Sequence, residues 1–199
     1  EQLPKHRTQR IAHIDLDYVY DRQPEQMLRN IDSVIERVSR LGVSTVYLQA
    51  FADPDGDGVA DAMYFPNRHV KMRSDLFSRV AWQLMQRAGV EVYAWMPMLS
   101  VNLGKQYDYI HDTRTGKPDP KHYLRLSPYS HKSRIALEEL YQDLAFHARF
   151  NGILFHDDGL MTDYEGHIAK GERSEAQYRR EAAQKGKDLI EHTERLKQA

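Results

Sequence analysis

A pair of adjacent acidic residues is the strongest candidate for catalysis in this sequence. Asp157 and Asp158 follow the apolar run 151–155, with His156 between the run and the pair. Two neighbouring carboxyl groups can serve acid–base chemistry, in which one donates a proton and the other acts as a base or stabilises developing positive charge. Because Gly159 permits a turn directly after the pair, both carboxylates could face one substrate. The alternative is structural: Asp158 caps a loop and Asp157 pairs with an arginine.

Acidic residues are concentrated in three windows that contain no Lys or Arg, at 11–21, 43–67 and 151–165. These windows hold 11 of the 29 acids of the chain, although its formal net charge is only −1. Acids segregated in this way indicate either a binding site for a cationic ligand or acid–base chemistry. The alternative is a set of solvated loops that happen to be rich in acid.

Two of these windows contain candidate ligands for a cationic group. Asp15 and Asp17 are separated by one residue, so we expect both side chains on the same face of the first strand. Because a buried acid without a partner is costly, we expect them at the exposed end of that strand. The motif DPDGDG begins at Asp53 and includes Asp55. It resembles the start of a calcium loop, but position twelve is Tyr64 instead of the required glutamate. We therefore predict an acidic substrate-binding loop and no metal site.

Aromatic residues near the acids could stack on flat or apolar faces of a ligand. We predict this role for Trp95, near the end of the run VEVYAWMPML, and a binding role for Tyr18 and His156. The alternative is that aromatic side chains at alternating strand positions belong to the core. The ten histidines show no metal-ligand spacing, so the sequence predicts neither a metal nor a cofactor.

Four apolar runs rich in β-branched and aromatic residues predict buried strands, and helix patterns lie between and after them. The expected strands cover 11–20, 44–51, 90–99 and 151–157. The expected helices cover 24–41, 74–89 with Ser74 as its N-cap, 127–150 and 174–197. This alternation predicts an α/β fold with a parallel sheet, whose C-terminal edge carries all three acidic windows. An open doubly wound sheet and a (β/α) barrel both fit; four units make only part of an eight-unit TIM barrel.

Several classes of protein are disfavoured by composition and motifs. With 41% hydrophobic residues the chain can form a core, and no apolar run is long enough for a membrane span. The first ten residues lack the apolar segment of a signal peptide. There is no cysteine, no G-x-S-x-G elbow and no Gly-rich phosphate loop. The conspicuous charge is acidic, which argues against nucleic-acid binding.

A series of motifs, in order, resembles a known family. The motifs are HIDLDYVYD, STVYLQAFADPDGDG, FPNR, VYAWMP, RLSPYS, GILFHDD and DYE. They resemble the C-terminal glycoside hydrolase domain of PgaB-type poly-β-1,6-N-acetyl-D-glucosamine N-deacetylases, over roughly residues 8 to 168. The resemblance implies a TIM-type barrel, of which residues 1–199 would form a single domain holding the N-terminal part, without the deacetylase domain. It also favours Asp157 and Asp158 as catalytic, and implies roles in activity or binding for Asp163 and Glu165.

The resemblance further implies an activity and a location. We expect an endo-acting hydrolase that binds and cleaves partially deacetylated poly-β-1,6-N-acetyl-D-glucosamine, a biofilm exopolysaccharide. The free amines of that polymer are cationic, in agreement with the acidic windows. The alternative is a non-catalytic polysaccharide-binding module that assists polymer export. The expected location is the periplasm or the outer membrane, and the export machinery is an expected partner.

Overall fold

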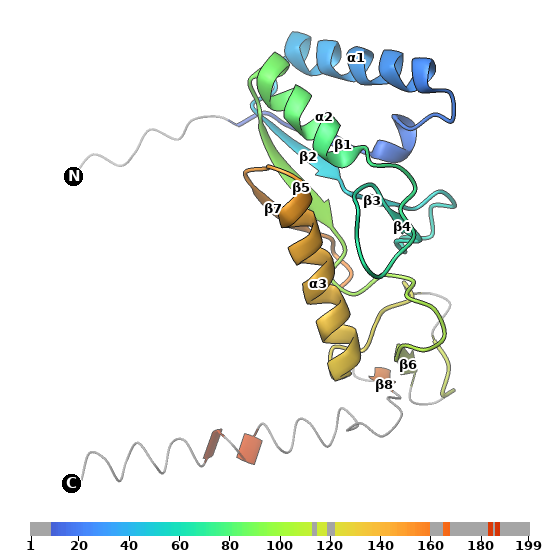
Figure 1. The fold of residues 1–199 in the computed structure, drawn as a ribbon. Helices are drawn as coiled ribbons and strands as arrows, with labels where there is room; N and C mark the ends of the chain where they lie inside the picture. The colour runs from blue at the N-terminus through green and yellow to red at the C-terminus, as the bar shows by residue number, and fades with distance from the viewer. Residues whose placement is uncertain are drawn as a thin grey trace, which may run out of the picture.

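The centre of the molecule is a sheet of four parallel strands in the order β1-β2-β5-β7 (Figure 1). The strands are β1 (Ile11–Ile14), β2 (Thr45–Gln49), β5 (Glu91–Met96) and β7 (Gly152–Phe155). This computed structural model describes residues 9–112, 115–118, 122–159, 165–167, 183–184 and 186–187. The predicted parallel α/β architecture is confirmed, and all four strands begin within one residue of the predicted positions.

The first strand is shorter than predicted. It ends at Ile14, and Leu16–Tyr18 form a single 3-10 turn, η1. The cause is local, because the carboxylate of Asp15 accepts the backbone N–H of Asp17 at 2.7 Å and caps this turn. The expectation that both acids share one strand face is therefore wrong: they lie in a turn beyond the strand.

Helix α1 (Pro24–Leu41) has the predicted bounds. Pro24 occupies the first turn, where its missing N–H costs nothing, and Gly42 ends the helix in the left-handed conformation with φ of 61°. The buried residues Ile31, Ile35 and Val38 recur at spacings of three and four, and this stripe belongs to the hydrophobic core.

Helix α2 (Phe77–Gln83) continues into a π-helical turn, η2 (Leu84–Ala88), which ends at Gly89. The prediction that Ser74 caps this helix is wrong, since the N-cap is Leu76 and makes no side-chain cap. Instead, the backbone carbonyl of Tyr64 accepts the N–H groups of Leu76 and Phe77, at 3.0 and 2.9 Å. The start of α2 is thus fixed by a distant segment, which no local pattern could reveal.

Helix α3 (His131–His147) is shorter at both ends than the predicted 127–150. The hydroxyl of Ser130 accepts the backbone N–H of Ser133 and caps the helix. The predicted helix 174–197 falls almost entirely outside the described residues. Within the part that is described, none of the helices combines the length and apolarity that a bilayer crossing needs.

Two small antiparallel pairs follow the sheet and are not predicted. The first joins β3 (Phe51–Ala52) to β4 (Ala62–Met63), and the second joins β6 (Ile110–Asp112) to β8 (Glu165–His167). Strands of two or three residues carry too short a pattern to be recognised. The first pair closes the segment 53–61, called the acidic loop below.

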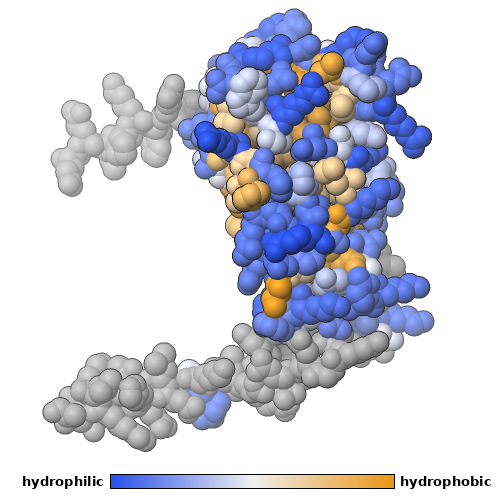
Figure 2. Space-filling view, in the orientation of Figure 1, coloured by the Kyte–Doolittle hydropathy of each residue, from blue (hydrophilic) through white to orange (hydrophobic). Residues whose placement is uncertain are grey.

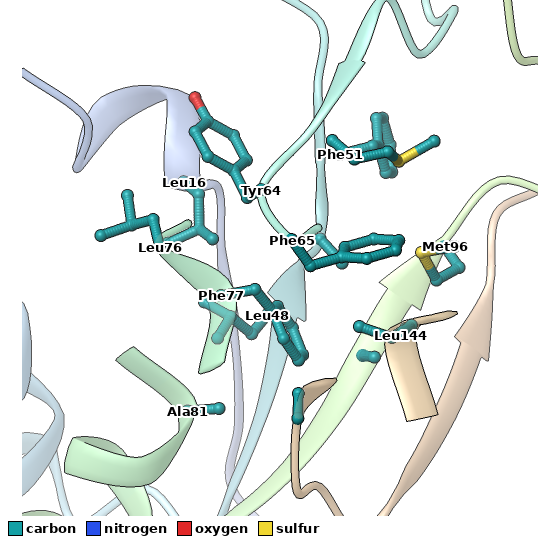
Figure 3. Close-up of a cluster of buried hydrophobic side chains, with 14 of the residues drawn as sticks. Leu16, Leu48, Phe51, Tyr64, Phe65, Leu76, Phe77, Ala81, Met96 and Leu144 are labelled. Carbon is teal, nitrogen blue, oxygen red and sulfur yellow. The ribbon is translucent and has the colours of Figure 1, made fainter. Parts of the chain in front are cut away.

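The hydrophobic core lies between one face of the sheet and the helices. Figure 3 shows Leu48 of β2 and Met96 of β5 pointing into the same cluster as Phe77 of α2 and Leu144 of α3. On β5, Tyr93 and Trp95 alternate with the buried residues Ala94 and Met96. They are only partly buried and face the other side of the sheet. The surface in Figure 2 is mainly hydrophilic, with separate small apolar patches.

Candidate functional site

Asp17 joins three segments at the C-terminal edge of the sheet. Its Oδ1 accepts a hydrogen bond from the hydroxyl of Tyr64 at 2.5 Å and forms an ion pair with Arg73. Its Oδ2 accepts the backbone N–H of Asp53 at 2.8 Å. In Figure 3 the hydroxyl of Tyr64 points away from the apolar cluster, toward the turn that carries Asp17. Because Arg73 neutralises its charge, Asp17 is placed to organise the site more than to bind a second cation.

Asp15 lies beside this network and has no ion pair of its own among the described residues. It accepts a hydrogen bond at 3.0 Å from the side-chain amide of Gln49, a buried residue at the end of β2. Burial raises the pKa of Asp15, and the negative charges of Asp17 and Asp53 raise it further. A neighbouring cation would relieve this repulsion, so the local field favours a positively charged ligand.

The acidic loop is wrapped around the carboxylate of Asp53. Oδ1 accepts the backbone N–H groups of Gly56 and Asp57 at 3.0 and 3.1 Å, and Oδ2 accepts that of Gly58 at 2.9 Å. Gly56 and Gly58 have φ of 73° and 82°, a conformation that disfavours other residues. Burial raises the pKa of Asp53, and the neighbouring carboxylates of Asp55 and Asp57 add to this effect.

The carboxylates of Asp53, Asp55 and Asp57 could each offer one ligand atom to a cation, and these atoms lie within 4.8 Å of one another. Both oxygens of Asp53 are already occupied by backbone amides, and the other two side chains are exposed. The arrangement fits the predicted acidic binding loop better than a dedicated metal site.

A cavity of about 400 Å³ opens between the turn after β1 and the acidic loop. It brings together four of the predicted binding acids with one arginine and one exposed tyrosine. Its lining comprises Asp15, Asp17, Tyr18, Gln49, Asp53, Pro54, Asp55, Gly56 and Arg73. With four carboxylates against one guanidinium, this cavity has the charge and size to accept a cationic sugar unit.

Asp158, one of the two predicted catalytic residues, is fully buried. Its Oδ1 accepts the backbone N–H of Met98 at 2.9 Å, and its Oδ2 accepts those of Leu99, at 2.8 Å, and Ser100. A carboxylate that accepts three backbone N–H donors inside the protein is held firmly in place by them. The structural alternative considered above for Asp158, a loop cap, describes these contacts.

Asp157 has the opposite environment, with a side chain that is 82% exposed. Its Oδ1 lies 3.4 Å from Nδ1 of His156, whose own side chain is 14% exposed. The second ring nitrogen of His156 is buried and has no hydrogen-bond partner among the described residues. Of the predicted pair, Asp157 is therefore the carboxylate that a polymer can reach.

Several aromatic rings lie close to the ring of His156. The ring of Trp95 lies 5.9 Å from that of Phe51 and 5.6 Å from that of His156, measured between centroids. The ring of Tyr123 lies 5.4 Å from that of His156, and it lies so close to Gly58 that any Cβ there would clash. Trp95 thus links β3 to the end of β7, and Tyr123 links the acidic loop to the end of β7.

The remaining predicted residues are described less fully. Asp163 lies outside the described residues. Glu165 is the first residue of β8, and its backbone lies opposite Asp112 of β6; the structure describes only the backbone of this residue. Their predicted roles in activity or binding stay predictions.

Sequence reasoning missed four residues of this site: Gln49, Tyr64 in its polar role, Arg73 and Tyr123. Gln49 alternates with Tyr47 along β2, so the period of two could have placed it beside Trp95, its partner in register. Arg73 and Tyr123 belong to irregular segments, where no period indicates which side chains approach the site.

A known family and several known proteins are similar to this chain. The sequence model of hypothetical glycosyl hydrolase family 13 matches residues 13–198. The chain is 55% identical, over 161 residues, to the poly-beta-1,6-N-acetyl-D-glucosamine N-deacetylases of Escherichia coli K12 and O157:H7. The match covers 79% of this chain and 24% of each relative.

A solved structure is also similar. The PgaB (BpsB) glycoside hydrolase domain from Bordetella bronchiseptica superposes with a TM-score of 0.73 at 46% identity, covering 79% of this chain and 46% of that one. The chain thus spans about a quarter of the curated relatives and less than half of the solved chain. This likeness confirms the predicted TIM-barrel type of fold. By its sequence, the chain belongs to hypothetical glycosyl hydrolase family 13.

Proposed function

We propose that this chain binds and cleaves partially deacetylated poly-β-1,6-N-acetyl-D-glucosamine as an endo-acting glycoside hydrolase. The observation that carries the proposal is the cavity between the turn after β1 and the acidic loop, with four carboxylates against one guanidinium. A deacetylated glucosamine unit carries an ammonium group, which this cavity would attract. The name of the curated relatives supports the same polymer, which they are said to deacetylate.

Asp157 is the residue that we propose to act on the glycosidic bond. Its exposed carboxyl group can reach the leaving oxygen and donate a proton to it, while the bond from that oxygen to the anomeric carbon breaks. A sugar that keeps its 2-acetamido group can stabilise the anomeric carbon through its own carbonyl oxygen. Water then forms a bond to the anomeric carbon and displaces the carbonyl oxygen, and its proton returns to the carboxylate of Asp157. This route needs one accessible acid at the end of β7, and Asp157 supplies it.

Stacking surfaces are the second part of the proposal. Trp95 lies between Phe51 and His156, and Tyr18, which is 87% exposed, lines the cavity. Flat aromatic faces bind the apolar faces of sugar rings, so these residues would hold neighbouring units of the polymer. For a protein that acts on this exported polymer, we expect a location in the periplasm or at the outer membrane and the export machinery as a partner.

A second candidate function is a binding module without catalysis that guides the polymer. One observation favours it: among the described residues, Asp158 is occupied by amides, which leaves one exposed carboxylate at the end of β7. Incubation with the polymer, followed by mass spectrometry and an affinity measurement, separates the two functions. Shortened oligosaccharides support the hydrolase, and binding without shortening supports the module.

A further inference from the structure

We propose that Asp158 is a positioning residue that holds the acidic loop in place through the segment 97–102. Although it is adjacent to the proposed catalytic residue, its carboxylate faces the interior. The backbone amides of Met98, Leu99 and Ser100 all donate to it. One side chain at the end of β7 therefore fixes the course of the chain directly after β5.

The segment held by Asp158 in turn holds the acidic loop. The carbonyl oxygen of Ser100 accepts the backbone N–H of Ala60 at 2.9 Å, and the backbone N–H of Asn102 donates to the carbonyl oxygen of Ala60 at 3.0 Å. The side-chain amide of Asn102 also donates to Asp61 at 3.2 Å. A continuous chain of hydrogen bonds therefore leads from Asp158, through Ser100, to the C-terminal side of the acidic loop.

The N-terminal side of the acidic loop is held by a different carboxylate. Asp17 accepts the backbone N–H of Asp53, the first residue of that loop. The loop is thus fixed on one side from the end of β1 and on the other from the end of β7. Its Asp53 and Asp55 line the cavity that we propose for the ammonium group. Asp158 would control the shape of this cavity without touching the ligand.

A carboxylate suits this position better than its isosteric amide. Two acceptor oxygens serve three converging N–H donors, whereas the side chain of an asparagine presents one acceptor and one NH2 group. In Asp158→Asn the NH2 group would oppose at least one backbone N–H in the interior, and that donor would lose its partner. The substitution should therefore loosen the segment 98–100 even though it barely changes volume.

A second hydrogen bond holds the same segment and can be removed separately from Asp158. The hydroxyl of Tyr141, on α3, donates to the carbonyl oxygen of Pro97 at 2.8 Å. Tyr141→Phe removes this hydrogen bond and leaves the carboxylate in place. If the segment 97–102 transmits the effect of Asp158, Tyr141→Phe should produce the same changes to a smaller extent.

Backbone amide hydrogen exchange, measured by NMR, tests the connection without any assumption about catalysis. In Asp158→Asn we expect exchange at Ala60 and Asn102 to accelerate about tenfold or more, as at Leu99 and Ser100, while the amides of β2 and β5 keep their protection. The matched control is Asp157→Asn, the same substitution on the neighbouring exposed residue, which should change none of these rates. If Asp158→Asn also loosens β2 and β5, Tyr141→Phe becomes the deciding variant.

A binding measurement separates positioning from a purely structural role. This readout rests on the proposed function, and its probe is a fully deacetylated β-1,6-linked glucosamine trisaccharide. We expect about tenfold weaker binding by Asp158→Asn and a smaller loss by Tyr141→Phe, at a temperature where both are folded. Acceleration confined to residues 98–100, or unchanged affinity in a variant with a loosened acidic loop, would overturn the proposal. If the native chain does not bind the probe, the proposed function fails, and the exchange rates still decide whether Asp158 holds the loop.

Discussion

Asp157 and Asp158 are consecutive in the sequence, yet their side chains lie in opposite environments. The first is 82% exposed beside His156, and the second is fully buried beneath the segment that follows β5. Strand β7 ends at Phe155 and both aspartates lie in the turn that follows, so the course of this turn gives their side chains different surroundings. A doublet that suggests two catalytic acids therefore consists of one accessible acid and one buried acid that accepts three backbone amides.

This division predicts different consequences for the same substitution at the two positions. Asp158→Asn should lower the free energy of unfolding by about 1–3 kcal/mol, because it leaves a buried amide donor without its acceptor. Asp157→Asn should change stability by less than about 0.5 kcal/mol, as is usual for exposed positions. Urea denaturation followed by circular dichroism measures both values. Equal stability of the two variants would contradict the environments described here.

The sequence predicts the framework of this molecule well. Buried parallel strands are long apolar runs, and α1 has a clear apolar stripe between Pro24 and Gly42, so both can be recognised locally. The parts that the sequence misplaces depend on single polar contacts. Asp15 turns the chain after Ile14 by capping η1, and the carbonyl of Tyr64 fixes the start of α2.

The candidate site is predictable to a similar degree. The acids could be assigned to one edge of the sheet, because the C-terminal ends of parallel strands meet there. Whether an acid is neutralised, as Asp17 is by Arg73, or buried, as Asp158 is, depends on segments far apart in the sequence. No period or motif encodes those partnerships.

Electrostatic attraction should dominate recognition of the polymer. Since the cavity holds Asp15, Asp17, Asp53 and Asp55 against Arg73, affinity should rise with the degree of deacetylation and fall as salt is added. Isothermal titration calorimetry with oligosaccharides of defined acetylation, at several salt concentrations, measures this. Equal affinity for the fully acetylated polymer, independent of salt, would exclude electrostatic recognition.

Binding should also depend on pH in a direction that the pKa shifts determine. Burial and neighbouring charge raise the pKa of Asp15 and Asp53 above the ordinary 3.8. As the pH falls, both groups therefore become protonated at a higher pH than an ordinary aspartate does. Affinity for glucosamine oligomers should begin to decline at that higher pH. Asp15→Asn should reduce this decline. A native profile that stays flat down to pH 4 would argue against both carboxylates as ligands.

Folding stability should respond to these two groups in the opposite sense. A pKa that is higher in the folded than in the unfolded state means that the folded state binds protons more tightly. The stability contributed by Asp15 and Asp53 is present at low pH and is lost as the pH rises through their folded-state values. Weakened binding in mild acid should therefore not be caused by unfolding through these groups, and thermal melts recorded beside the titrations check this.

The edges of the sheet predict association. Within the described residues β1 and β7 each pair on one side only, and the face that carries Tyr47, Tyr93 and Trp95 is only partly buried. Open edges and partly uncovered apolar faces favour contacts between chains. We expect residues 1–199 alone to self-associate at micromolar concentrations and to be a slow hydrolase. Sedimentation velocity measures the first expectation, and a stable monomer with rapid turnover would contradict it.

The most direct test of the central proposal is the cleavage of partially deacetylated poly-β-1,6-N-acetyl-D-glucosamine, followed over time by mass spectrometry. The native chain should release shorter oligosaccharides, and Asp157→Asn should release them at least about 100-fold more slowly, the usual loss when a general acid is removed. Glu36→Gln, which changes an exposed acid on α1, is the matched control and should keep the native rate. Products released at the native rate by Asp157→Asn, or no products from the native chain, would contradict the proposal.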